Sequence, residues 1–175
     1  MSAGTVKQPR SKPALARSAA PVLVKRKTIS KIGATKQADS GLFKRIVTNK
    51  PLAGFDAVAA IREGYPASML KAASSYFKVP DLRIQTIVQI PASTASRLEK
   101  KLARIDSGAT ERIYRMGTVM RMAIDVFDNE AAAIDWMRQP SRVFGNAAPL
   151  DLMDTEPGAV SVRQVLNAIA TGGAA

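Results

Sequence analysis

A stretch of helical periodicity between residues 113 and 127 constrains the fold of this chain more than any other feature. Its apolar side chains recur every three or four residues: Ile113, Met116, Gly117, Met120, Ile124 and Phe127. This spacing places them on one face of an α-helix of roughly five turns, and we expect Thr110 to cap its N-terminus. Core packing is the favoured role of the methionines, with an adaptable partner surface as the alternative. The helix is therefore predicted to be the spine of a small helical bundle.

Prolines and glycines divide the chain ahead of this spine into short segments with the same helical period. The predicted helices are Leu52–Arg62, Ala67–Phe77, one capped by Asp81 that runs to Ile90, and one capped by Ser93 or Thr94. Their inward-facing residues are predicted to be Leu70, Ala73 and Phe77, then Ile84, Ile87 and Val88, then Leu98, Leu102 and Ile105.

Two further helices and a turn are predicted after the spine. Asn129 is expected to cap a helix with Ala133, Trp136 and Met137 on one face, which Pro140 ends. Gly145 and Asn146 tolerate left-handed backbone angles and predict a turn before a one-turn helix, Leu150–Met153. Thr155 is expected to cap the last helix, whose apolar stripe is Val162, Val165, Leu166 and Ile169, with Gly172 at its C-terminal end.

Two short helices joined by a tight turn, the second of them basic, are the pattern of a helix-turn-helix. In such a motif the second helix shows side chains to the major groove of DNA while its back packs on the first. The candidate DNA-binding residues are Ser93, Thr94, Ser96, Arg97, Lys100 and Lys101. The alternative is that these side chains simply form a solvated helix face.

Positive charge is concentrated at the start of the chain. Residues 1–40 contain nine Lys or Arg and a single acidic residue, Asp39, together with three prolines and no aromatic residue. The segment is interpreted as a disordered basic arm. Its alternatives are non-specific attraction to a polyanion, an inert solvated leader, and an organellar transit peptide, which the prolines disfavour.

The sequence contains no histidine and no cysteine, which excludes disulfides, thiolate catalysis and zinc-ribbon sites. The acidic cluster Asp125, Asp128 and Glu130 lacks the central glycine of a calcium loop, and no glycine-rich phosphate loop follows a strand. No membrane span or signal peptide is recognised, and we expect a cytoplasmic protein without a cofactor or metal. Catalysis is disfavoured because no nucleophile, base and orienting group come together.

Two segments near the C-terminus resemble a known family. "AAAIDWMRQPSRVFG" and "AAPLDLMDTEPGA", within residues 111–172, are similar to the toxin-binding domain of the Xre/MbcA/ParS antitoxins, most of all to its ParS branch. Upstream, "IVQIPASTASRLEKKL" loosely follows the helix-turn-helix of that family.

The resemblance implies a type II antitoxin that binds a RES-domain toxin, an enzyme that consumes NAD by transferring ADP-ribose or by degrading the dinucleotide. It implies that the C-terminal helix and tail cover the NAD site, that the chain forms homodimers within 2:2 or larger complexes, and that it represses its own operon. The toxin-binding residues implied by position are Arg138, Arg142, Asn146, Arg163, Asn167, Thr171 and Gly172.

Three residues depart from the family pattern. Gln89 replaces the glycine of the helix-turn-helix, Pro91 replaces the serine that caps its second helix, and Ala148 replaces a threonine before Pro149. The first two weaken the case for DNA binding relative to toxin binding. A DNA-binding regulator without a toxin partner remains the alternative function.

These observations predict an all-α fold with three parts. Residues 1–40 are the basic arm, residues 41–108 an Xre-like helix-turn-helix region, and residues 109–175 a small helical toxin-binding domain.

Overall fold

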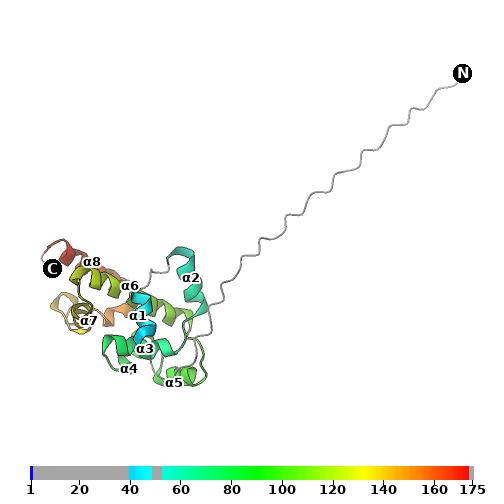
Figure 1. Ribbon diagram of the computed structural model, residues 1–175, viewed down its shortest axis with the longest axis horizontal. Coiled ribbons are helices and arrows are strands. Elements are labelled where there is room, and N and C mark those ends of the chain that lie inside the picture. Colours follow the sequence, from blue (N-terminus) through cyan, green and yellow to red (C-terminus); the bar gives the residue numbers. More distant parts are fainter. Residues whose placement is uncertain (2–39, 49–52, 174–175) are drawn as a thin grey trace. The chain divides into compact units, whose positions relative to one another are not determined.

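The computed structural model describes Met1 and residues 40–48 and 53–173, and the elements that they form are helices, as predicted (Figure 1). No β-strand occurs among them. The elements are α1 (Ser40–Thr48), α2 (Gly54–Glu63), α3 (Ser68–Phe77), α4 (Asp81–Val88), α5 (Ala92–Lys100), α6 (Ser107–Phe127), α7 (Glu130–Arg138), the short 3-10 helices η1 (Arg142–Phe144) and η2 (Asp151–Asp154), and α8 (Glu156–Ala170). The predicted basic arm lies outside the described residues, apart from Met1 and Ser40.

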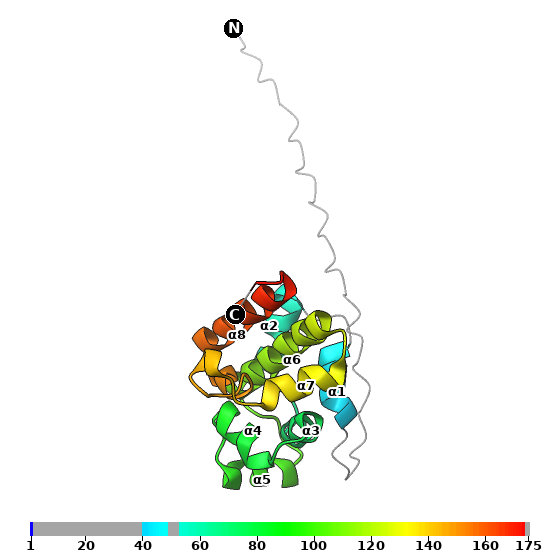
Figure 2. The same ribbon diagram turned by 90° about the vertical axis from the view of Figure 1, so that its left-hand side faces the viewer.

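Helix α6 is the spine that the periodicity predicted. Ile113, Met116 and Met120 are fully buried, and the end of the stripe, Ile124 and Phe127, is partly buried against the same core. Helices α1, α2, α4, α7 and α8 all contact α6, which runs through the middle of the helical assembly in Figure 2. One continuous core therefore joins the region of α3, α4 and α5 to the region of α7 and α8.

Helix α1 was not predicted, because its apolar face spans only two turns. Phe43 is fully buried, and its ring packs on Tyr76 at 5.0 Å and Phe77 at 5.2 Å between ring centroids. Gly117 of α6 makes room for Ile46, whose Cγ2 would lie 2.5 Å from a Cβ at that position. Arg121 donates hydrogen bonds to the carbonyl oxygens at the end of α1. A glycine inside the stripe of α6 thus marks where another helix crosses closely.

The caps predicted for the spine and for the helix after Pro80 are both wrong. Helix α6 begins at Ser107, and its cap is Asp106, whose Oδ1 accepts from the N–H of Ala109 at 2.9 Å. Thr110 lies instead in the first turn, where its buried hydroxyl joins α6 to the α2–α3 connection by accepting from the N–H of Tyr65. Asp81 is the first residue of α4 after Pro80 and accepts a hydrogen bond from the Ser74 hydroxyl. Neither side chain caps its own helix: Asp106 already caps α6, and α4 begins directly after Pro80 without a side-chain cap.

Glu130 connects three helices at the first turn of α7. It accepts from Lys44 of α1 at 2.6 Å and from the hydroxyl of Tyr76 of α3 at 2.8 Å. The hydrogen bond from Lys44 is the main reason why the pKa of Glu130 lies below its usual range, and Tyr76 adds to the effect against the opposing influence of burial. Burial and the bond to Glu130 raise the pKa of Tyr76, so its hydroxyl remains a donor.

This network predicts a contribution to stability that acid removes. The lowered pKa of Glu130 stabilises the fold fully above its unfolded value of about 4.3, and the contribution is lost as pH falls through the folded pKa. Urea unfolding from pH 7 to pH 3 should therefore show a steeper acid loss for the wild type than for Glu130→Gln. Asp125→Asn, at an exposed carboxylate of α6, is the control and should follow the wild type. Parallel profiles for the wild type and Glu130→Gln would contradict the assignment.

Candidate functional site

Helices α4 and α5 meet at the tight turn that the sequence predicted. Gln89 follows α4 with a φ of 61°, and its N–H and that of Ile90 bond the carbonyl oxygens of Thr86 and Gln85. This is the Schellman arrangement, in which the left-handed residue is usually glycine. Gln89 takes that conformation with a side chain, which is held by a 2.8 Å hydrogen bond from Arg112. The missing glycine therefore does not prevent the turn.

The start of α5 differs from the prediction. The helix begins at Ala92 directly after Pro91, and no side chain caps it, so neither Ser93 nor Thr94 has the predicted capping role. Proline already fixes φ near its value here of −58°, and its extended ψ of 144° leads the chain into the helix.

The end of α5 also differs, because the helix stops at Lys100. Leu102 has a φ of 50° and is 75% exposed, so its predicted inward position is wrong. The N–H groups of Leu102 and Ala103 bond the carbonyl oxygens of Glu99 and Leu98, which closes the helix before Leu102 can join its buried face. Ile105 is buried as predicted, but it lies in the connection to α6.

The outer face of α5 carries the candidate DNA-binding side chains. Thr94 is half-buried, and the others are exposed: Ser93, Ser96, Arg97, Lys100 and Lys101. Arg104 lies just beyond the end of α5 and instead forms an ion pair with Glu63 at 2.9 Å. The structure thus presents a short cationic face on the second helix of the motif, as DNA contact requires.

Helix α8 follows the predicted pattern closely. Thr155 caps it by accepting from the N–H of Gly158, Val162 and Leu166 are fully buried, and Val165 and Ile169 are half-buried. Gly172 has a φ of 70° after the helix, where its N–H and that of Gly173 bond carbonyl oxygens of the last turn. The C-terminal residues Ala174 and Ala175 lie outside the described residues.

The candidate toxin-binding residues on α8 differ in their exposure and in the contacts that they make. Arg163 makes an ion pair with Glu156 at 2.5 Å, which holds it along the helix. Asn167 is exposed, and its carbonyl oxygen accepts from Thr171. Thr171 and Gly172 are exposed at the end of the helix.

The other candidates lie at the connection from α7 to η2. Arg138 ends α7 and pairs with Asp135 at 2.7 Å. Arg142 and Asn146 are exposed in a compact turn, where Gly145 and Asn146 have the predicted left-handed angles. The turn is closed by hydrogen bonds from the N–H of Asn146 to the oxygen of Ser141 and from the N–H of Ser141 to the oxygen of Ala147.

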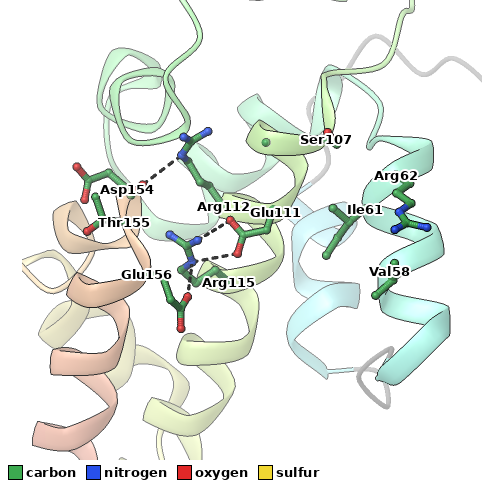
Figure 3. Close-up of a pocket in the computed structure, with 11 residues that line it drawn as sticks. Val58, Ile61, Arg62, Ser107, Glu111, Arg112, Arg115, Asp154, Thr155 and Glu156 are labelled. Carbon is green, nitrogen blue, oxygen red and sulfur yellow. Dashed lines mark hydrogen bonds and ion pairs between the residues drawn. The ribbon is translucent and has the colours of Figure 1, made fainter.

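Two arginines of α6 attach η2 and the start of α8 to the spine, and sequence reasoning missed both (Figure 3). Arg115 is buried, pairs with Glu111 at 2.5 Å and with Glu156 at 3.1 Å, and donates to the carbonyl oxygen of Met153 at 3.1 Å. Arg112 donates to the carbonyl oxygen of Asp154 at 3.2 Å. The i, i+4 spacing of Glu111 and Arg115 is the one sequence signal for this cluster.

Arg112 and Arg83 tie α4 to the C-terminal helices. Arg112 also reaches the carbonyl oxygen of Val88, at the end of α4. Arg83 of α4 forms a bidentate ion pair with Asp151 of η2, with N–O distances of 2.7 and 2.9 Å, and also donates to the carbonyl oxygen of Arg138. The helix-turn-helix is thereby fixed against η2 and α7.

An open pocket of about 570 Å³ lies beside Arg112 and Arg115, bounded by Val58, Ile61 and Arg62 of α2 on its far side (Figure 3).

Within the described residues, no cluster of three or more acidic side chains is placed to hold a metal ion. None of the helices described there has the length and apolar character needed to cross a membrane.

An all-α chain in which a helix-turn-helix is fused to a C-terminal helical module is the class that this fold and these surfaces define. Residues 56–116 match the model of the antitoxin Xre-like helix-turn-helix domain, and residues 122–172 match that of the antitoxin Xre/MbcA/ParS C-terminal toxin-binding domain. Together the matches cover well over half of the chain.

Two relatives extend the likeness along most of their length. The chain is 28% identical over 116 residues to the antitoxin Xre of Yersinia enterocolitica, which covers 66% of this chain and 78% of the relative. It is 28% identical over 115 residues to the antitoxin Xre of Photorhabdus laumondii, which covers 65% and 78%. The chain belongs to the Xre/MbcA/ParS family of antitoxins.

Proposed function

We propose that this protein is a type II antitoxin that neutralises an NAD-consuming RES-domain toxin by direct binding, with α8 and the tail covering the NAD site. The observation that carries the proposal is the match of residues 122–172 to a toxin-binding domain. The geometry supports it, because Arg112 and Arg115 hold the end of η2, and Arg115 also Glu156 at the start of α8, on the spine, while Asn167 and Ala170 in the last turn of α8 are exposed. A rigidly mounted helix loses little conformational freedom on binding.

The residues proposed to face the toxin lie on two neighbouring segments of that region. Asn167, Thr171 and Gly172 form the exposed end of α8, where small side chains can enter a cleft shaped for a dinucleotide. Arg142 and Asn146 project from the compact turn before η2. Arg138 and Arg163 complete the proposed set and would exchange their ion pairs with Asp135 and Glu156 for contacts to the toxin.

The proposed role is inhibition by binding, so the chain itself is not an enzyme and uses no cofactor. Its work is to block the toxin in the cytoplasm as part of a homodimer within a 2:2 or larger complex.

Repression of its own operon is a second proposed activity. The exposed cationic face of α5 favours it, because Arg97 and Lys100 can reach phosphate or base edges once the helix lies in a major groove. If no toxin partner exists, DNA binding becomes the main function.

A pair of variants separates the two activities. Deleting residues 167–175 removes the last turn of α8 and should weaken inhibition of the toxin by at least about a hundredfold, because it removes the proposed blocking segment. Operator binding by this variant should be unchanged. The protein to test as the toxin is the product of the adjacent reading frame. It is co-purified with the chain and assayed for NAD consumption.

Arg97→Ala with Lys100→Ala is the reciprocal variant. It should lower the slope of operator affinity against salt by about 2 on logarithmic axes and leave toxin inhibition intact. Full inhibition by the truncated chain would refute the role of α8 and the tail. An unchanged salt slope in the double variant would refute DNA contact by α5.

A further inference from the structure

A second hollow, smaller than the pocket in Figure 3, lies between η1 and α8. It has a volume of about 320 Å³ and is lined by Val143, Phe144, Ser161, Gln164, Val165 and Ala168, which we call the η1–α8 groove. All six residues lie within the range that matches the toxin-binding domain, and none of them is charged. Val143 is 50% exposed.

The groove occupies a different face of α8 from Arg163, one of the toxin-facing candidates. Ser161, Gln164, Val165 and Ala168 follow the spacing i, i+3, i+4, i+7 and form one stripe beside the buried one. At about 100° per residue, Arg163 lies roughly 150° from the centre of that stripe, whereas Asn167 and Thr171 follow Gln164 by three and seven residues and lie at its edge. Arg163 therefore cannot share the centre of one flat interface with the stripe, whereas Asn167 and Thr171 can border it.

The stripe in the groove is better prepared for a partner than the face that carries Arg163. Arg163 is already held by Glu156 at 2.5 Å, and a partner would have to break that ion pair. The side-chain amide of Gln164 is exposed and makes no hydrogen bond within the described residues, so it is free to bond a partner. The apolar side chains around it offer contact area with little desolvation cost.

The opposite wall of the groove is rigid before any partner arrives. The turn that carries Val143 is closed by the backbone hydrogen bonds between Ser141 and Asn146 and between Ser141 and Ala147. The ring of Phe144 packs edge-on against Trp136, with 6.2 Å between ring centroids. Binding energy at interfaces concentrates where one apolar side chain fills a preformed pocket that polar contacts surround.

We infer that the η1–α8 groove is the main anchoring point for the toxin and receives one of its aliphatic or aromatic side chains. The segment that carries this side chain presents a hydrogen-bonding group to Gln164 and a carboxylate to Arg142, which is exposed next to Val143. The inference rests on the proposed function. It adds that the energy of toxin binding comes chiefly from the groove, while the tail supplies the block of the NAD site.

The test compares two exposed valines of similar accessibility. Val143, in the groove, is 50% exposed, and Val160, on α8 but outside the lining of the groove, is 38% exposed. Val143→Ser should raise the dissociation constant for the purified toxin roughly tenfold or more, because it removes part of the apolar contact. Val160→Ser should change it less than about twofold. Thermal unfolding of each variant checks that the fold is intact.

A second variant fills the groove instead of weakening it. Ala168→Leu adds an apolar side chain on a half-buried helical position, which suits leucine, and should also weaken toxin binding roughly tenfold or more. Wild-type affinity in both Val143→Ser and Ala168→Leu, or a loss confined to Val160→Ser, overturns the inference while toxin binding itself stands. A wild-type chain that binds no such toxin overturns the proposed function and the inference with it.

Discussion

Replacing Gly158 by alanine is expected to destabilise the protein by about 1–3 kcal/mol, although alanine is the better helix former. Gly158 lies in the first turn of α8, where a Cβ would collide with the backbone oxygen of Leu152 in η2 and lie 3.1 Å from the carbonyl carbon. Backbone atoms cannot rotate away as the end of a side chain can. The variant must therefore push η2 and α8 apart or bend the first turn.

Gly108→Ala is the matched control, because Gly108 lies in the first turn of α6. Its Cβ would meet side-chain atoms of Asp106 at 3.2 Å and Arg112 at 3.4 Å, which can adjust. Urea unfolding of both variants measures the difference. Equal stability of the two variants would show that the close approach of η2 to α8 is not what requires glycine in the segment "TEPGA".

Replacing Arg115 by methionine is the second large expected effect, a loss of about 1–3 kcal/mol in the free energy of unfolding. The side chain of Arg115 is 9% exposed, and its loss leaves the carbonyl oxygen of Met153 without its donor. Glu111 and Glu156 are 38% and 55% exposed, so water can solvate them once the pairs are broken. The buried carbonyl group is therefore the main source of the loss.

Arg163→Met tests that explanation, because Arg163 shares the partner Glu156 but is 32% exposed. A partly exposed ion pair contributes little, and we expect a change within about 0.5 kcal/mol. Denaturant titration at neutral pH measures both variants. Equal losses at the two positions would mean that the ion pairs with Glu156 matter and the bond to Met153 does not.

Local pattern was enough to predict most of the helices. The stripe of α6, the caps Asn129 and Thr155, and the turn at Gly145 and Asn146 all agree with the structure. Each depends on interactions within a few residues of the chain, so the signal is present in consecutive residues. Helix α2 and η2 differ from the predicted helices by only one or two residues at the bounds that the structure describes.

The errors share a physical origin. Leu102 has helical spacing, yet the backbone turns to the left at that residue and exposes it. Helix α1 is too short to be recognised by its own pattern, and it is stabilised by packing of Phe43 on the rings of α3. At Leu102 the position of the helix end outweighed the local preference, and at α1 contacts with residues distant in sequence did so.

By itself the sequence determined the all-α class, the spine, the last capped helix and the family resemblance, because helical period and caps act over a few residues. Only the tertiary structure decided how Arg83, Arg112 and Arg115 fix the helix-turn-helix to the C-terminal helices, since those bonds join residues 24 to 68 positions apart. It also decided which face of α8 adjoins a groove. Side-chain contacts between distant segments depend on how helices cross, and no local pattern records that geometry.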